Sequence, residues 1–385
     1  MKPDRLLVSN LGQIEQADIE FGDLTVLVGP QATGKSLLLE CLELCVDGLA
    51  VRRTLRDNGI EPRDWSDFVQ LVFGEGMQHL WTDSTTVSLN GSSIGKPLLR
   101  RRKGFEEAVH RLTFIPAQRT LALPTGFPQR FREFGPETPF VVRRYSAQLH
   151  DALVNGRYEK AGKLFPNPGR LRESMRQQII GSVFHGAELL IDRNARANDL
   201  RLRLPDGSQL PMMAWTAGQR EFIPLLLGLY SLLPAGKVSK DADIDWIVIE
   251  EPEMGLHPQA IIAVMNLVVN LVARGYKVVL STHHPLVLDV VWTIAQIRES
   301  GHRDSAKILC KALGGGGDPR LVENAEAVLG KQLRVHALDY TKQGTVRTND
   351  ISSLDPGDVD EVVSGWGGLT GVSARLLDSV AAVSA

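Results

Sequence analysis

The spacing of hydrophobic residues divides the chain into predicted strands and helices. Residues 5–10 and 24–28 carry the alternating or continuous apolar pattern of β-strands. The second of these runs enters a glycine-containing loop and then residues 36–50, whose leucines recur at the spacing of an α-helix. The N-terminal part of the chain therefore has the order strand, loop, helix.

The same succession of strand and helix recurs in the second half of the chain. Residues 244–250 form an apolar run that precedes a predicted helix at 258–273. Residues 277–281 form another, which precedes a predicted helix after Pro285. Repeated units of this kind predict an α/β fold with a mixed β-sheet at its core.

Residues 60–110 have a less regular pattern. Residues 70–76 and 85–95 are predicted as strands, the second with a tight turn at Asn90 and Gly91. A basic run follows, which consists of Arg100, Arg101, Arg102 and Lys103. The middle of the chain then reads as an insertion into the α/β core.

This predicted insertion begins where the composition shifts to proline, glycine, phenylalanine and arginine, from residue 121 to about 168. Helical spacing predicts a helix at 145–153 and a longer one at 169–190. A hairpin signal at Asp206 and Gly207 follows. The insertion is therefore expected to be largely helical.

The composition is that of a folded globular protein. Of 385 residues, 43% are hydrophobic and 23% are charged, and the formal net charge of -2 gives no global attraction to nucleic acid. Three cysteines are too few for a disulfide framework, so we expect the reducing cytoplasm. The longest apolar stretch, residues 261–273, is shorter than a bilayer span, and no membrane anchor is expected.

The loop after the second predicted strand matches the pattern G-x-x-x-x-G-K-[ST] of a phosphate-binding loop. It consists of Gly29, Pro30, Gln31, Ala32, Thr33, Gly34, Lys35 and Ser36. We expect Lys35 to reach the terminal phosphates of ATP and the Ser36 hydroxyl to bind Mg²⁺. The alternative is a chance match in a glycine-bearing turn, which the context of strand and helix disfavours.

The apolar run at 244–250 ends in one carboxylate, and a second carboxylate follows it directly. Glu250 and Glu251 stand where α/β sheets bind ligands. Glu250 is a candidate to hold Mg²⁺ through water, and Glu251 is a candidate to polarise the attacking water. An acidic, solvated start of a loop is the alternative interpretation.

The run at 277–281 ends near two histidines. His283 is the candidate to contact the γ-phosphate, because one imidazole at this point can report whether that phosphate is present. His284 points to the opposite side of an extended chain, so the pair has poor spacing for a metal ion. Structural capping of the next helix is the alternative.

In this order, the phosphate-binding loop, the strand that ends in acids and the turn at 282–285 resemble the ABC-type ATPases, in particular the branch with SMC, RecF and OLD proteins. The resemblance covers residues 4–36 and about 110–290. It implies a P-loop NTPase fold of the ABC type. The implied segments are the first part of the ATPase head at 1–120, an insertion or lid at 121–205, the second part of the head at 206–300 and a C-terminal extension at 301–385.

The resemblance also implies roles for single residues. Glu250 corresponds to the magnesium-associated acid, Glu251 to the catalytic base and His283 to the switch histidine. Gln118 corresponds to the glutamine that senses magnesium and the γ-phosphate. A signature-like loop, which would contact the nucleotide of another subunit, consists of Thr216, Ala217, Gly218 and Gln219. A plain helix N-cap is the alternative for this loop.

Three departures from the family pattern bear on activity. They are Glu250 in place of aspartate, Ala217 in place of glycine, and Gln31-Ala32 in place of Asn-Gly. The first leaves room for a third interpretation, in which the chain is a nucleotide-binding scaffold with negligible turnover.

The resemblance implies two nucleotides held between two heads. Because one chain has one phosphate-binding loop, we expect a head-to-head dimer or a higher oligomer that ATP closes and hydrolysis opens. The expected function is that of a Mg²⁺-dependent ATPase, a nucleotide-gated switch or scaffold for an effector such as a nuclease or toxin in bacterial phage defence. The ATPase subunit of the PARIS system is one relative of this kind.

A DNA-repair or DNA-sensing ATPase is the second interpretation. The basic run at 100–103 could bind DNA phosphates, together with further arginines of the insertion. These are Arg130, Arg132, Arg143 and Arg144. Solvated charged faces or salt bridges with nearby glutamates explain the same residues equally well.

Overall fold

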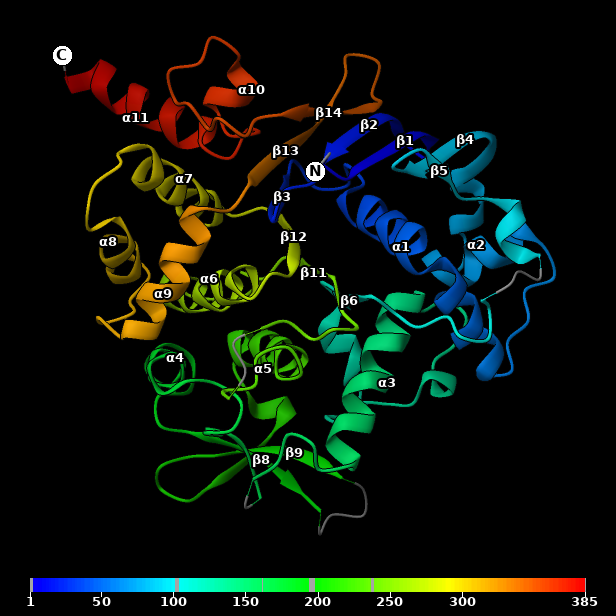
Figure 1. Ribbon diagram of the computed structural model, residues 1–385, viewed down its shortest axis with the longest axis horizontal. Helices are drawn as coiled ribbons and strands as arrows, with labels where there is room; N and C mark the ends of the chain where they lie inside the picture. Colours follow the sequence, from blue (N-terminus) through cyan, green and yellow to red (C-terminus); the bar gives the residue numbers. More distant parts are fainter. Residues whose placement is uncertain (1–2, 101–103, 161, 194–197, 237–238, 385) are drawn as a thin grey trace.

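The computed structural model describes residues 3–100, 104–160, 162–193, 198–236 and 239–384. The chain forms a large central sheet with helices packed against it, and a second, smaller sheet lies apart from it (Figure 1).

The central sheet has ten strands. Side by side, they are β5 (Ser92–Ser93), β4 (Trp81–Leu89), β1 (Arg5–Leu11), β2 (Ile14–Glu20), β14 (Val346–Asp350), β13 (Leu333–Tyr340), β3 (Leu24–Val28), β12 (Lys277–Thr282), β11 (Trp246–Glu250) and β6 (Leu112–Ile115). Neighbouring strands from β13 to β6 are parallel, whereas β5, β4, β1 and β2 are antiparallel. The expected mixed sheet is therefore confirmed.

The strand before the phosphate-binding loop does not adjoin the strand that ends in acids. β12 lies between β3 and β11 and is parallel to both. The carboxyl ends of these three strands therefore meet at one edge of the sheet. This edge brings together three segments that are far apart in the sequence. They are the loop at 29–36, Glu250 with Glu251, and the turn at 282–285.

The longer helices are α1 (Lys35–Asp57), α2 (Trp65–Phe73), α3 (Phe140–Val154), α4 (Glu173–Ile179), α5 (Ala217–Leu229), α6 (Pro258–Ala273), α7 (Pro285–Glu299), α8 (Ser305–Ala312), α9 (Pro319–Leu329), α10 (Glu361–Ser364) and α11 (Gly371–Ser384). Alternate strand residues divide between two cores. Ile247 and Ile249 of β11 pack in the core that holds α5 and α6, whereas Val248 packs in the core that holds α1 and α2. Helices thus cover both faces of the sheet.

The small sheet arises from the region that was expected to be a helical insertion. Its antiparallel strands are, side by side, β10 (Gln209–Pro211), β9 (Asp199–Arg203), β8 (Glu188–Asp192) and β7 (Lys163–Phe165). The long helix expected at 169–190 is wrong. α4 passes into a π-helical turn, η5 (Ile180–Phe184), and the left-handed backbone of His185 and Gly186 ends it before β8 begins.

Two further expectations differ from the structure. The strand expected at 70–76 is wrong, because these residues belong to the end of α2 and the loop after it. Asp64 caps this helix by accepting a hydrogen bond from the Asp67 N–H, and Phe68 and Val72 share its buried face. Residues 301–385, expected as an extension, supply β13 and β14 to the middle of the central sheet.

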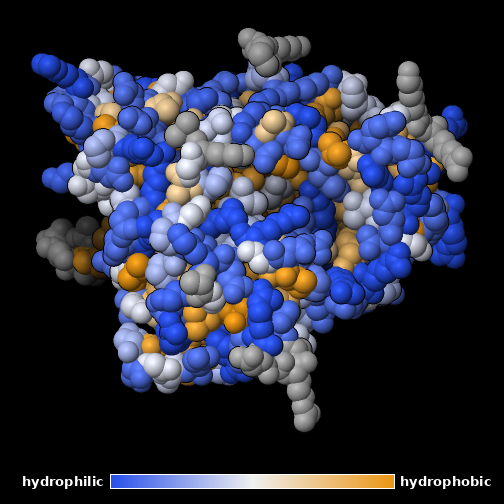
Figure 2. Space-filling view, turned by 60° about the horizontal axis from the view of Figure 1, so that its bottom comes forward, coloured by the Kyte–Doolittle hydropathy of each residue, from blue (hydrophilic) through white to orange (hydrophobic). Residues whose placement is uncertain are grey.

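Among the described residues, no helix is long and apolar enough to cross a membrane. On the face shown in Figure 2, hydrophobic residues form small patches that hydrophilic residues separate.

Candidate functional site

The phosphate-binding loop makes a tight turn between β3 and α1 that its glycines permit. Gly29 has a φ of 145°, and a Cβ there would lie 2.3 Å from the carbonyl oxygen of Leu338 on β13. Gly34 has a φ of 90° and precedes the first turn of α1. Both positions therefore exclude side chains, and the backbone approaches its neighbours closely.

Ala32 is one of the departures from the family pattern, and it adopts a backbone that glycine adopts more easily. Its φ of 61° lies in the left-handed region, which costs a non-glycine residue about 1 kcal/mol. Two side chains hold this conformation by donating to the Ala32 carbonyl oxygen, the Gln13 amide and the Tyr340 hydroxyl, the latter at 2.9 Å.

Lys35 lies buried across its own loop. Its Nζ donates to the carbonyl oxygens of Gly29 and Pro30, each at 2.8 Å. Burial lowers the pKa of Lys35 to about 8, although the nearby carboxylates of Glu251, Glu253 and Glu250 act in the opposite direction. The lysine of the loop and the acids of β11 therefore share one electrostatic environment.

Glu250 is buried at the end of β11, close to Ser36. Its Oε2 accepts a hydrogen bond from the Ala117 N–H at 3.0 Å, whereas its buried Oε1 has no hydrogen bond of normal geometry. Burial raises the pKa of Glu250, and the Ser36 hydroxyl and the Ala117 N–H lower it. A buried carboxylate beside a serine hydroxyl is a donor set that fits Mg²⁺.

Glu251 and His283 face each other at the edge of the sheet. His283 Nε2 lies 3.1 Å from Glu251 Oε1, and both side chains are about 30% exposed. The Glu251 N–H donates to the carbonyl oxygen of Ser281 at 2.9 Å, which extends the pairing of β11 with β12 by one residue. The structure therefore places the expected base and the expected switch histidine within hydrogen-bond distance, where solvent can reach them.

The turn at 282–285 is held by an acid that sequence reasoning did not select. Glu253 is buried, and its Oε1 accepts from the Thr282 hydroxyl at 2.7 Å and from the His283 N–H at 2.9 Å. His284 Nδ1 accepts from the Leu286 N–H at 3.1 Å and so caps α7. Of the two histidines, His284 has the structural role and His283 faces the site.

Gln118 and its neighbour Arg119 have opposite environments. The Gln118 side chain is exposed, and within the described part of the chain it makes no hydrogen bond. Arg119 is fully buried and contacts backbone carbonyls at the end of β11. Sequence reasoning missed Arg119 because contacts with backbone atoms more than 100 residues away leave no local pattern.

The signature-like loop begins α5 as a capping box. The Thr216 hydroxyl accepts from the Gln219 N–H at 3.2 Å, and the Gln219 side chain accepts from the Thr216 N–H at 3.1 Å. A Cβ at Gly218 would lie 2.8 Å from the carbonyl oxygen of Gly255. The loop is therefore a helix N-cap that packs against the chain following Glu253, and Thr216 remains exposed.

The structure removes Arg143 and Arg144 from the arginines considered for DNA, whereas Arg130 and Arg132 are exposed. Arg144 is buried with Glu43 at 2.6 Å, and Arg143 is buried over the ring of Phe131. Neither faces solvent. Of the basic run, Arg101, Arg102 and Lys103 lie outside the described residues, and Arg100 is exposed.

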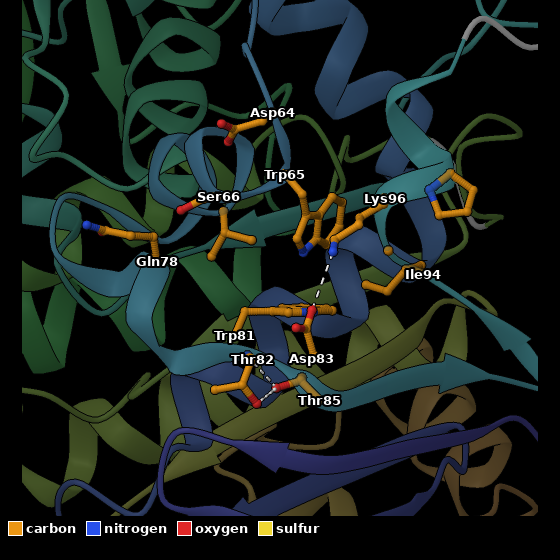
Figure 3. A pocket seen from close by; sticks show the side chains of 13 residues that line it. Asp64, Trp65, Ser66, Gln78, Trp81, Thr82, Asp83, Thr85, Ile94 and Lys96 are labelled. Atoms are coloured by element: carbon orange, nitrogen blue, oxygen red, sulfur yellow. Dashed lines mark hydrogen bonds and ion pairs between the residues drawn. The ribbon is translucent and has the colours of Figure 1, made fainter.

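A cavity of about 600 Å³ lies near the edge of the central sheet that β5 and β4 form, between the start of α2 and β4 (Figure 3). The rings of Trp65 and Trp81 meet edge to face there, with centroids 5.1 Å apart. Lys96 and Asp83 form an ion pair of 3.4 Å at its rim. Its lining includes none of the residues predicted to bind nucleotide.

Part of the chain matches a known protein family, and the chain is similar to solved structures of low sequence identity. Residues 187–289 match the AAA domain family described as putative AbiEii toxin, type IV toxin–antitoxin system. No curated protein matches the chain. Among solved structures, the chain is similar to the SMC head domain from Thermotoga maritima, at 13% identity over 91% of this chain and 99% of that chain, with a TM-score of 0.35. It is also similar to an SMC head bound to the C-winged helix domain of ScpA, at 10% identity over 90% of this chain and 97% of that chain, with a TM-score of 0.44.

The matched segment runs from β8 to the start of α7, so it includes the signature-like loop, both acids and His283. The parallel strands, the loop between β3 and α1 and this match together define the fold as an α/β P-loop NTPase. The match supports the expected resemblance to ATPases of this kind over residues 187–289.

Proposed function

We propose that the chain is a Mg²⁺-dependent ATPase whose site is completed by a second copy, and that it acts as a nucleotide-gated switch for an effector. The observation that supports this best is the meeting of phosphate-binding and acidic residues at one sheet edge. These are Lys35, Ser36, Glu250, Glu251 and His283.

The residues of the loop fit the phosphates of ATP. The backbone at 29–36 and the start of α1 present N–H groups, and the close approach at Gly29 leaves no side chain over them. Lys35 exchanges its carbonyl partners for the terminal phosphates. Ser36 and Glu250 would hold Mg²⁺, which neutralises phosphate charge when it is bound.

Glu251 is the proposed general base. It accepts a proton from the water that attacks the γ-phosphorus, the bond from that phosphorus to the ADP oxygen breaks, and ADP and inorganic phosphate leave. Its partly exposed carboxylate is open to water, and its left-handed backbone aims it toward His283. His283 is proposed to contact the γ-phosphate.

The second copy would supply the signature-like loop. Thr216 is exposed, and the positive end of α5 begins at that point. The capping box satisfies the first turn of α5 in the free chain, and the exposed hydroxyl remains open to a phosphate held by another copy. ATP binding would then favour a closed dimer and hydrolysis an open one.

The effector is proposed to be a separate protein such as a nuclease or toxin in phage defence. The matched family is described as a putative toxin of a toxin–antitoxin system, which connects residues 187–289 with systems of two interacting components. The description belongs to that family, so its transfer to this chain is part of the proposal.

Light scattering and phosphate release, measured together with Mg²⁺ and ATP, test the proposal. Wild type should gain mass and release phosphate, Lys35→Ala should do neither, and Glu251→Gln should gain mass without releasing phosphate. Lys96→Ala, which removes an exposed lysine from the distant cavity, is the matched control and should behave as wild type. Unchanged mass and no turnover in every variant would contradict the switch and favour a constitutive scaffold.

A further inference from the structure

Arg119 places one buried guanidinium against three separate segments. Its Nη1 donates to the carbonyl oxygens of Glu250 at 3.0 Å and Pro116 at 3.4 Å. Its Nη2 donates to the carbonyl oxygen of Glu251 and its Nε to that of Glu221, each at 3.0 Å. A planar group with five N–H donors in fixed directions suits several carbonyls at once, which a lysine cannot match.

The carbonyls at the end of β11 need such a donor. β11 ends at Glu250, and the chain turns away from β12 after Glu251. Buried carbonyl oxygens without partners cost free energy, so a turn at this depth requires hydrogen bonds from outside the ladder. Arg119 provides them.

The backbone of Glu251 is strained in a way that these hydrogen bonds oppose. Its φ of 42° lies in the left-handed region, which costs a non-glycine residue on the order of 1 kcal/mol and persists only where the surroundings hold it. The Glu251 N–H is held by Ser281 and its carbonyl oxygen by Arg119. This conformation brings its carboxylate to 3.1 Å from His283 Nε2.

The same guanidinium contacts the helix that follows the signature-like loop. Glu221 lies in the first turns of α5, and its Oε2, which has no hydrogen bond, lies 3.6 Å from Arg119 Nε. The charge of the buried arginine is thereby compensated from α5. A shift of α5 would change the position of Arg119, and with it the carbonyls of Glu250 and Glu251.

From these contacts we infer that Arg119 is a positioning residue that fixes the backbone of Glu251 for hydrolysis and couples it to α5. The inference rests on the proposed ATPase activity and adds a residue outside its catalytic set. Arg119 acts through Glu251 and does not touch substrate.

Steady-state kinetics of Arg119→Ala and Arg119→Lys test the inference. A misaimed base should lower kcat about 100-fold in Arg119→Ala and about tenfold in Arg119→Lys, with KM for ATP within about threefold of wild type. Guanidinium chloride at low millimolar concentration should restore kcat several-fold in Arg119→Ala, because the small ion fits the space of the missing group. It should restore nothing in Glu251→Gln.

Arg143→Ala is the matched control, since it also removes a buried guanidinium, but one that packs on Phe131 and donates to the carbonyl oxygen of Leu71. It should lower thermal stability and leave kcat unchanged. If Arg119→Ala does not fold, Arg119→Lys decides. The inference would be overturned if wild type turns over ATP, Arg119→Lys keeps the wild-type kcat, and guanidinium does not rescue Arg119→Ala. A wild type without turnover would instead contradict the proposed function on which it rests.

Discussion

Lys35 lies near three carboxylates, yet burial is the larger effect on its ionisation. Burial lowers the pKa to about 8, whereas Glu251, Glu253 and Glu250 raise it. In the free chain its charge is therefore partly lost in mildly alkaline solution. A bound phosphate would favour the charged form and raise this pKa again.

This predicts that ATP affinity falls as the pH rises through 8. Below pH 8 Lys35 already carries the proton that phosphate binding requires, and above pH 8 the proton must be taken up from solution. The dissociation constant for ATP should be about tenfold larger at pH 9 than at pH 7, and binding at pH 9 should take up nearly one proton per site. Titration calorimetry in two buffers of different ionisation enthalpy measures both quantities.

Lys35→Arg is the control for this effect, because arginine stays charged over the whole range. Whatever its absolute affinity, it should show no proton uptake at pH 9. Equal ATP affinity of the wild type at pH 7 and pH 9, without proton uptake, would show that the pKa of Lys35 is not lowered in this way.

At the scale of elements, α1 and α3 are joined by a buried ion pair. Glu43 and Asp47 lie on one face of α1, and Arg144 of α3 contacts them at 2.6 Å and 4.0 Å. Arg144 also donates to the carbonyl oxygen of Leu112 on β6. Burial raises the pKa of Glu43 to about 7, and Arg144 acts against this rise. The helix that begins at the phosphate-binding loop is thus fixed to the neighbouring helix and strand.

Arg144→Ala should therefore destabilise the fold by about 3 kcal/mol at pH 8, because the buried Glu43 must then either stay charged without its partner or take up a proton from alkaline solution. The loss should be smaller at pH 6, where Glu43 accepts a proton and its negative charge disappears. Urea denaturation at both pH values measures this. The exposed Arg130→Ala is the control and should change stability by about 0.5 kcal/mol or less. Equal stabilities of the two variants would contradict the structural role.

Elements with a strong local pattern could be predicted from the sequence. β11, α6, β12 and α7 lie where the apolar runs and the helical spacing placed them, because their patterns are continuous. Of the small sheet, only the hairpin of β9 and β10 at Asp206 and Gly207 could be predicted. β8 could not, because it lies at the end of a stretch, residues 169–190, whose apolar spacing also fits a helix. The short apolar run in α2 fits either a strand or a helix, and its N-cap at Asp64 decides for a helix.

The site shows the same limit. The loop at 29–36 and the acids could be predicted because each is one continuous motif beside a strand. Arg119 and Glu253 could not, because their hydrogen bonds join residues that only the folded sheet brings together. Gln118 was selected by resemblance alone, and its side chain is exposed beside the residue that makes the buried contacts.

For the molecule as a whole, a strand from the N-terminal part and a strand from the C-terminal part of the chain meet beside the phosphate-binding loop. β13 pairs with β3 (Figure 1). The carbonyl oxygen of Leu338 on β13 lies against Gly29. Tyr340, at the end of β13, donates to the carbonyl oxygen of Ala32. The region that the sequence suggested as an extension thus belongs to the nucleotide-binding fold, and its position depends on strand pairing over 300 residues.

The central claim is that one copy completes the active site of another. Mixing two inactive variants tests it directly. Lys35→Ala removes phosphate binding, and Thr216→Asp keeps a good N-cap for α5 but sets a negative charge where the partner's phosphate is proposed to lie. Thr216→Ser, which keeps both the cap and the hydroxyl, should remain active as the control.

Phosphate release is then measured for each variant alone and for an equal mixture. In a mixed dimer, the chain with Thr216→Asp has an intact phosphate-binding loop, and the chain with Lys35→Ala has an intact signature-like loop, so one complete site forms. Random pairing should restore about a quarter of wild-type activity, as half of the dimers then carry one working site of two. A mixture no more active than its components would contradict a site shared between copies.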